Sequence, residues 1–394
     1  MAGINGLRGT GQFGTDFRPT NYRELYTLLE PNGSAPLNAL LSMGSSQSTD
    51  DPKYNNFRDE LPDRKLKINN GSGYNATATT LQLDTNDAGV PYVVAGSIIV
   101  NSRTGEVMRA TAAGDTTNHR VTVARNIAGG SLTMNDNDDL FVAGFAASEG
   151  DTSPDALSFD PTVAFNYTQI FRTAFEVSNT LKQTYRRTGD AEDEYMTKAL
   201  KMHMSDIERA MFFGKKVEES GSTATPRRYT GGIMNELTNV LDQASNSSAN
   251  VLSETGFDNL LSDTVFAFGS KQKIAFCGTT CANLLQQIGK ARWQPTVVSG
   301  TYGINFTKYS TYAGELLVHV HPQFRQIPGM ANDMVIIDFP YLKYRFLEGR
   351  DTTLLQNRQT PDKDASKHEY LTECGLELMQ DKVHSVIKNW NSLT

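Results

Sequence analysis

The spacing of hydrophobic residues along the chain changes near residue 190. The stretch from Phe165 to Ser178 is predicted to form one long strand, whereas apolar residues from Asp190 to Lys216 recur every three or four positions. The second pattern predicts one long amphipathic helix, with Gly189 ending the extended chain and Asp190 as the N-cap. Because its apolar stripe is narrow, we expect this helix to lie flat across a broader structure. The stripe consists of Met196, Ala199, Leu200, His203, Ile207, Ala210, Met211 and Gly214.

Residues 1–65 are predicted to form an arm with few apolar anchors. Two short helical patches, 21–30 and 36–43, are followed by a segment at 54–62 in which aromatic and acidic residues stand side by side. Nothing in this region could bury a core of its own. The arm is therefore expected to wrap a neighbouring molecule, and a disordered tail is the alternative.

Residues 75–150 are predicted to form a small inserted β-barrel-like module. Short apolar runs alternate there with turn signals such as those at 101–105 and 127–130, which favours a compact barrel or sandwich. Small barrels that bind oligonucleotides carry interleaved aromatic and basic residues, which this region lacks. We therefore expect a packing or surface-displayed module. The predicted strands are 79–83, 92–94, 97–100, 106–110, 120–124 and 140–143.

The chain after Gly256 mixes helices and strands, so the overall fold class is predicted to be α+β. Helices are expected at 257–269 and 279–290, and the long helix should lie across the sheet that the C-terminal strands form. The predicted strands are 273–277, 302–309, 315–321, 334–339, 341–347, 370–380 and 383–390.

Composition narrows the function classes. The 394 residues carry a net charge of −7, which argues against wholesale nucleic-acid binding because that requires a basic face. Three cysteines fit a reducing compartment without a disulfide framework. No signal peptide and no run of roughly 20 apolar residues is found, so neither secretion nor a membrane is expected.

Candidate reaction centres are weak. His319 and His321 lie two apart on a predicted strand and could share a metal, but no pattern marks a third ligand. His203 lies on the apolar stripe and is expected to be packed and hydrogen-bonded. The carboxylates at 190–194 suit a helix N-terminus. Neither a phosphate loop nor a nucleophile elbow occurs, so we predict no enzyme, no metal and no cofactor.

The candidate functional residues are instead assembly contacts. They are two aromatic residues and one arginine of the arm, three aromatic residues of the long strand, one apolar residue of the long helix, and a basic pair within 221–233. That pair could touch packaged phosphate or a partner carboxylate, and an ordinary solvated loop is the alternative. The candidates are Tyr54, Phe57, Arg58, Phe165, Tyr167, Phe171, Ile207, Arg227 and Arg228.

The order of these parts resembles the Hong Kong 97-type major capsid proteins of tailed bacteriophages. The likeness is to a branch with an inserted β-module near the extended loop. It rests on the segments 95–109, 146–150, 165–171, 207–214, 231–233 and 291–293.

The resemblance implies a shell subunit that forms hexamers and pentamers, whose N-terminal arm and extended loop cross onto neighbouring capsomers. Some relatives join neighbours by a Lys–Asn bond aided by a Glu, a trio that we cannot place here. The implied division is an arm at 1–65, extended-loop strands at 66–74 and 151–186, the module at 75–150, a spine helix at 187–216, a peripheral domain at 217–295 and 336–394, and an axial domain at 296–335.

The resemblance also implies partners and a location. Expected partners are a scaffolding protein, a portal, a possible decoration protein, and packaged DNA lining the inner surface without sequence-specific binding. The subunit would be part of the virion after assembly in the host bacterial cytoplasm.

Two alternatives to the capsid function remain. They are an encapsulin-like protein cage and a β-rich hydrolase that uses Glu106 and Asp139.

Overall fold

The computed structural model describes most of the chain and divides it into two compact units. Unit 1 combines the residues up to Asn56 with Ala164–Thr394, and unit 2 is Phe57–Val163. The predicted helix at 21–30 lies outside the described residues. Those residues are 35–61, 63–85, 89–127, 129–150, 153–154, 156–158, 160–186, 189–219, 224–246, 252–288, 297–298 and 306–392.

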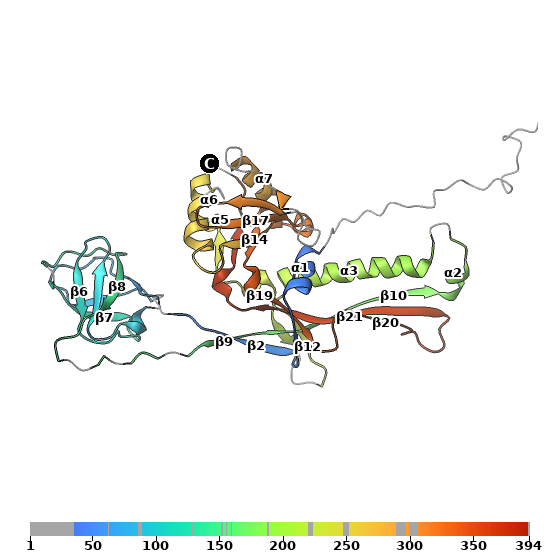
Figure 1. Ribbon diagram of the computed structural model, residues 1–394, viewed down its shortest axis with the longest axis horizontal. Coiled ribbons are helices and arrows are strands. Elements are labelled where there is room, and N and C mark those ends of the chain that lie inside the picture. The colour runs from blue at the N-terminus through green and yellow to red at the C-terminus, as the bar shows by residue number, and fades with distance from the viewer. Residues whose placement is uncertain are drawn as a thin grey trace, which may run out of the picture. The chain divides into compact units, whose positions relative to one another are not determined.

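Unit 1 contains a five-stranded sheet with one long helix lying along it (Figure 1). The strand order is β1-β19-β21-β10, and β20 pairs with β21 beside β19. The predicted long strand is interrupted at Thr168, which divides it into β9 and β10. The strands of the sheet are β1 (Ser46–Thr49), β10 (Gln169–Ser178), β19 (Leu342–Leu347), β20 (Thr353–Leu355) and β21 (Ala365–Leu378), and β9 (Thr162–Tyr167) lies outside it.

The long helix, α3, spans Ala191–Phe213, which is shorter at both ends than the predicted 187–216. Asp190 is its N-cap as predicted, because its carboxylate accepts a hydrogen bond from Glu192 N at 2.9 Å. Gly214 ends the helix where the backbone oxygens of Ala210 and Thr230 leave no room for a Cβ. The short helix α2 (Asn179–Gln183) replaces part of the predicted extended-loop segment 151–186.

The buried face of α3 confirms the predicted stripe, and the helix packs against one of the predicted C-terminal strands. Ala199, His203, Ile207 and Met211 are buried. The helix packs mainly along β10 and β21, and β21 contains most of the predicted strand 370–380. The C-terminal strands divide between two sheets, and the predicted strands between 273 and 339 belong to the other sheet. Those strands meet only the C-terminal part of the helix, where the core that contains Phe212 also contains residues of that sheet.

The second sheet of unit 1 has seven strands in the order β13-β22-β18-β14-β17-β16-β15. It corrects the predicted boundary at 295/296, because β14 from the predicted peripheral domain pairs with β17 from the predicted axial domain. The strands are β13 (Val240–Asp242), β14 (Gln272–Cys277), β15 (Val297–Val298), β16 (Phe306–Ser310), β17 (Glu315–Val320), β18 (Met334–Ile337) and β22 (Ser385–Lys388).

Helices of the C-terminal region bury this sheet on one side. Predicted helices at 257–269 and 279–290 appear as α6 (Glu254–Leu260), which a π-helical turn extends to Val265, and as α7 (Thr279–Ile288). Phe257, Leu261 and Leu285 share a core with strands β14 and β18. Short helices α4 (Ile233–Glu236) and α5 (Gln243–Asn246) precede them. Among the described helices, none is long and apolar enough to span a membrane.

The described part of the arm packs against its own subunit, which corrects the expectation that it has no anchors there. Helix α1 (Pro36–Gly44) buries Leu37, Leu40 and Leu41 in the core that contains Ile207 of α3. Strand β1 then pairs in parallel with β19. Residues 36–49 are therefore structural parts of unit 1, and the arm prediction now concerns only the residues before them.

Unit 2 is a closed six-stranded barrel. Its strands follow the order β3-β8-β5-β6-β7-β4, and a bridge between Ile68 and Leu83 joins the two ends of this order. Alternate residues such as Ile99 and Met108 fill the interior. The strands are β3 (Lys65–Lys67), β4 (Thr80–Gln82), β5 (Ser97–Asn101), β6 (Val107–Ala110), β7 (Arg120–Ala124) and β8 (Asp139–Phe145).

The barrel starts earlier than predicted. Strand β3 pairs with β8 inside the barrel, so residues 65–67 belong to the module rather than to an extended-loop strand at 66–74. The predicted strand at 92–94 is wrong as well. Residues Val90–Tyr92 form a 3-10 turn there, which suits Pro91 because proline cannot donate a ladder hydrogen bond.

Candidate functional site

The candidate site is the place where the chain leaves unit 1 through β2 (Lys53–Arg58) and returns through β9, two strands that pair with each other. Tyr54 is buried at the start of β2, and its hydroxyl donates to Leu376 O at 2.9 Å. Asn166 on β9 donates to the same carbonyl at 2.7 Å, and its Oδ1 accepts from Gly231 N at 2.7 Å. Both strands are thereby tied to β21 at their unit 1 ends.

Gly375 makes this attachment possible. A Cβ at Gly375 would lie 2.5 Å from the Tyr54 hydroxyl oxygen and 2.6 Å from Tyr167 O. Both distances are shorter than a carbon atom tolerates, and the second neighbour is backbone that cannot move easily. The close crossing of Tyr54 over β21 therefore requires a residue without a side chain at position 375.

Gly375→Ala is expected to displace Tyr54 and lower the free energy of unfolding of unit 1 by about 1–3 kcal/mol, as overpacking typically does. The measurement is urea denaturation of the unassembled subunit. Gly144→Ala is the matched control, since a Cβ at Gly144 meets nothing within 4 Å. Equal stability of the two variants would contradict this account of the attachment.

Phe165 lies between two ammonium groups at the same place. Lys53 Nζ lies 4.5 Å and Lys216 Nζ 4.6 Å from the centre of its ring. These are cation–π distances, and Lys216 also pairs with Glu236 at 2.8 Å. Tyr167 packs edge-on against Phe165 with ring centres 5.7 Å apart. Phe165 and Tyr167 therefore hold β9 to unit 1, a role that their sequence pattern did not distinguish from contact with a neighbour.

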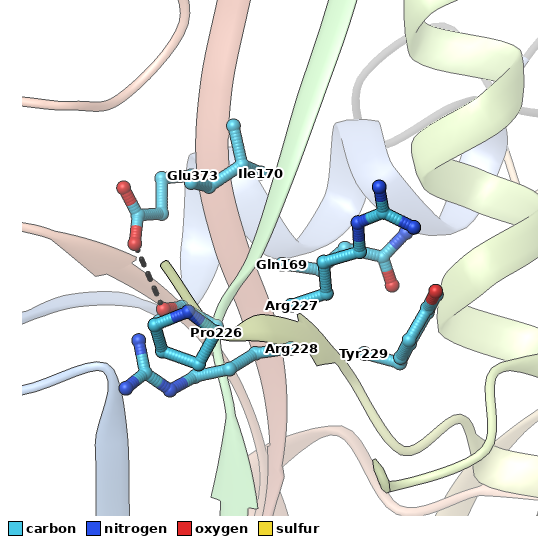
Figure 2. Close-up of a pocket in the computed structure, with 8 residues that line it drawn as sticks. Gln169, Ile170, Pro226, Arg227, Arg228, Tyr229 and Glu373 are labelled. Carbon is cyan, nitrogen blue, oxygen red and sulfur yellow. Dashed lines mark hydrogen bonds between the residues drawn. The ribbon is translucent and has the colours of Figure 1, made fainter. Parts of the chain in front are cut away.

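The predicted basic pair lies in strand β12 (Arg227–Tyr229), which forms a hairpin with β11 (Val217–Glu219). The two side chains point to opposite sides of the strand (Figure 2). Arg228 Nε donates to Glu218 at 2.8 Å, so its charge is already paired. Arg227 is exposed, and no ion pair joins it to the described residues. It lines a hollow together with Thr168, Gln169, Ile170, Pro226, Tyr229 and Glu373.

Phe57 and Arg58 lie at the far end of β2. Phe57 is 74% exposed, and Arg58 O accepts a hydrogen bond from Thr162 Oγ1 of β9 at 3.2 Å. Leu61 and Val163, which the sequence did not single out, are 88% and 57% exposed. The two ends of unit 2 therefore carry large exposed apolar side chains, and such groups usually mark a contact surface.

Three candidates lie inside the subunit instead. Tyr54, Phe171 and Ile207 are at most 8% exposed. The burial of Ile207 confirms its place on the predicted apolar stripe, whereas we correct Tyr54 and Phe171 from contact residues to residues that support the fold, since their own subunit covers them. Apolar periodicity alone could not separate a buried face from an interface.

The histidines form buried hydrogen bonds. His203 is packed and hydrogen-bonded as predicted, with Thr173 Oγ1 at 3.0 Å from Nδ1 and Thr372 Oγ1 at 2.8 Å from Nε2, and burial lowers its pKa. His321 is fully buried, and its Nε2 lies 2.8 Å from Glu208 Oε1. His321 thus has a partner that explains it without a metal, and the described residues form no cluster suited to one.

Glu208 is the important residue that sequence reasoning missed. It is fully buried on α3, and besides His321 it accepts hydrogen bonds from Leu37 N at 2.9 Å and Asn38 N at 2.7 Å. Its carboxylate therefore satisfies the free N–H groups at the start of α1. One side chain joins α1, the long helix and the segment after β17. The only signal in the sequence for this role was the position of a glutamate within the apolar stripe of the long helix.

Glu106 and Asp139, the two carboxylates of the hydrolase alternative, both have structural places in the barrel. Glu106 is 5% exposed and forms an ion pair with Arg125 at 2.5 Å. Its Oε2 also accepts from Leu132 N at 3.0 Å, which ties a loop to the barrel. Asp139 begins β8 and is exposed, opposite Lys67 in the register of the barrel. These contacts account for both residues as parts of the barrel.

Comparisons with known proteins cover almost the whole chain. The family model described as SU10 major capsid protein matches residues 9–391. The major capsid protein of Pseudomonas phage PaMx41 is 28% identical over 335 residues, which cover 82% of this chain and 77% of that relative.

Solved structures to which this chain is similar include a capsid, a phage structure and an encapsulin complex. The capsid of the native GTA particle is 10% identical with a TM-score of 0.46 and covers 96% of this chain and 97% of that chain. The structure from Mycobacterium phage Adephagia is 8% identical with a TM-score of 0.44 and covers 96% of this chain and 96% of that chain. The holo-SrpI encapsulin complex from Synechococcus elongatus PCC 7942 is 13% identical with a TM-score of 0.41 and covers 59% of this chain and 76% of that chain.

Proposed function

The chain belongs to the SU10 major capsid protein family and is a phage major capsid protein whose copies form the capsid shell, and from this premise we propose which of its surfaces makes the shell. The fold is of the α+β Hong Kong 97 type, with α3 as the spine helix. The encapsulin-like and hydrolase alternatives have less support than the phage capsid assignment, and the family is a structural one.

We propose that the exposed apolar residues at the two ends of unit 2 contact a neighbouring copy. The observation that supports this proposal is the exposure of Phe57, Leu61 and Val163 beside a firmly attached base at Tyr54 and Asn166. A fixed base reduces the conformational entropy that the segment would lose on binding. Apolar side chains that are exposed in the free subunit would be buried on assembly, where they contribute about 1.5–3 kcal/mol each when fully covered.

The remaining partner assignments are proposals as well. They follow from the family resemblance. They are assembly into hexamers and pentamers, contact between capsomers through the extended loop, and binding of a scaffolding protein, a portal, a decoration protein and packaged DNA. Assembly in the host bacterial cytoplasm follows from the family resemblance too.

We further propose that the seven-stranded sheet is the axial domain and that α3 with the five-stranded sheet is the peripheral domain. Arg227 is available to a partner carboxylate or to phosphate.

Electron microscopy of the expressed protein tests the function directly. Shells, rings or sheets are expected, with the scaffolding protein present where the subunit needs it. DNA rather than an enzyme is the expected cargo of particles from infected cells. A protein that stays monomeric at high concentration with scaffold present would overturn the assignment.

Phe57→Ser is expected to lower the particle yield at least tenfold while leaving the melting temperature of the subunit unchanged, because the side chain is exposed and touches little of its own fold. Particle yield is measured by sedimentation and electron microscopy. Ile127→Ser is the control, since Ile127 is a 52% exposed apolar residue in the barrel. A normal yield from Phe57→Ser would remove this segment from the interface.

A further inference from the structure

Strand β10 is an edge strand of the five-stranded sheet. It pairs with β21 from Gln169 opposite Cys374 to Ser178 opposite Ala365, and no other described strand pairs with its outer side. Natural edge strands are usually short or carry charged side chains (lysine above all), proline or a bulge that prevents pairing with another chain. This ten-residue strand contains neither lysine, proline nor glycine, its register has no shift, and its two charges, Arg172 and Glu176, are of opposite sign.

The hydrogen-bond pattern shows which residues of β10 face outward. Glu373 N of β21 donates to Arg350 O, away from β10. Because directions alternate along an antiparallel ladder, the even-numbered residues of β21 face β10, and their partners are the odd-numbered residues of β10. Arg172, Ala174 and Glu176 therefore direct their N–H and C=O groups to the free edge. No hydrogen bond to these N–H groups comes from the described part of the chain.

The same residues have accessible side chains. Ala174 is exposed, while the side chains of Arg172 and Glu176 are 55% and 31% exposed. Their neighbours Phe171 and Val177 face the opposite side of the sheet and are buried. The outer edge of β10 is therefore accessible over its central part, together with the side chains on one face of the strand.

We propose that β10 of one subunit pairs antiparallel with β10 of a second subunit about a two-fold axis at Ala174. The inference rests on the proposed function, because a shell brings many copies of this strand together. In this register Arg172 lies opposite Glu176 of the partner subunit, and Glu176 lies opposite the partner's Arg172. The small side chains of the two Ala174 residues meet on the axis. Three hydrogen-bonded pairs exchange about six backbone hydrogen bonds, two for each pair.

Charge selects this register over its neighbours. Centring the axis on Thr173 would oppose Arg172 to Ala174 of the partner subunit, and centring it on Phe175 would oppose Glu176 to the same alanine. Within the subunit Arg172 already pairs with Glu369, and Glu176 pairs with Lys363 at 2.7 Å. Only the axis at Ala174 places a second opposite charge beside each of these exposed ion pairs. The interface is isologous, as a closed two-fold contact requires. The two five-stranded sheets would then continue into each other.

Cysteine cross-linking tests the register. In assembled Ala174→Cys particles, the two introduced sulfurs lie within disulfide range, because hydrogen-bonded antiparallel pairs have Cα atoms about 5.5 Å apart. Mild oxidation with diamide is expected to convert most subunits into covalent dimers on a non-reducing gel. The native cysteines are buried, and burial raises the pKa of Cys277 and Cys374 to about 12, so they should not contribute.

Ser178→Cys is the matched control on the same edge. Its sulfur would lie eight residues along the strand from its symmetry mate, about 27 Å away, so no dimer is expected. Dimers from Ser178→Cys would overturn the register. Particles of Ala174→Cys that stay monomeric on the gel, while the introduced thiol reacts with a small maleimide, would overturn the pairing and leave the capsid function intact.

Ala174→Pro provides a second readout. It removes an outward N–H that has no bond within the described subunit, and edge strands tolerate proline at such positions. We expect an unchanged melting temperature of the subunit and a particle yield reduced at least tenfold. An unchanged particle yield would contradict the pairing. Failure of the wild-type protein to form particles would instead count against the proposed function.

Discussion

Glu208→Ala is expected to lower the free energy of unfolding of the subunit by about 3–5 kcal/mol. Three buried donors would lose their acceptor, namely the backbone N–H groups of Leu37 and Asn38 and the ring of His321. Each such loss costs roughly 1–3 kcal/mol, and local relaxation recovers part of the sum. Since α1 is held to the long helix by this carboxylate, α1 itself should also become sensitive to protease.

Urea denaturation and limited proteolysis of the unassembled subunit measure both effects. Asp206→Ala is the matched control on the same helix, since its side chain is 57% exposed and its contact with Arg209 is long, at 4.0 Å. We expect that variant to lie within about 0.5 kcal/mol of wild type, as exposed substitutions usually do. If Glu208→Ala were equally mild, α1 would have to be held by its leucines alone.

Ile207→Asp is expected to prevent assembly, because it places a carboxylate in the core between α1, α3 and β21. Ile207 is 1% exposed and belongs to an apolar core cluster. Burying an unpaired charge costs at least several kcal/mol, on the order of 4, which is a large part of the stability of an ordinary domain. Insoluble or unassembled protein is the expected result, measured as the soluble fraction and the particle yield.

Met202→Asp provides the comparison on the same helix. Met202 is 59% exposed, so an added carboxylate stays hydrated there and should leave folding intact. A normal particle yield from Ile207→Asp would mean that the buried face of the long helix is assigned wrongly. Loss of folding in both variants would point to a general intolerance of α3 to charge.

Local patterns predicted the regular elements well. Helix α3, its cap at Asp190, helix α7 and the hairpin of β16 with β17 all follow from periodicity and turn residues close in sequence. The packed His203 was also predictable from its place on the apolar stripe. These features depend on neighbours within a few residues, which is why the sequence was sufficient for them.

Boundaries that depend on distant pairing were less predictable. Strand β3 joins the barrel because Leu66 lies opposite Leu140, more than 70 positions later in the chain. The arm became part of unit 1 because Glu208 lies where the N–H groups of α1 need an acceptor. Short segments with ambiguous patterns take their structure from such partners, and the partners cannot be identified from local sequence.

The candidate site was predicted only in part. Phe57 is exposed beside the base of β2 and β9, and Phe165 and Tyr167 help to form that base. Exposed Leu61 and Val163 were missed, because an apolar residue in a short segment suggests burial unless the fold shows otherwise. Tyr54 and Phe171 were assigned to the surface, although their own subunit covers them.

By itself the sequence determined the succession of an arm, a β-module, a long helix and a mixed C-terminal region, together with the resemblance to a shell-forming family. Periodicity and order along the chain are enough for that. Only the tertiary structure decided which apolar residues are core and which are surface, and that β10 is an edge. It also places Lys273 in the interior, where its ammonium group donates to the carbonyls of Val265 and Val383 at 2.6 Å each. Burial and free edges are properties of contacts between distant segments, so no local pattern contains them.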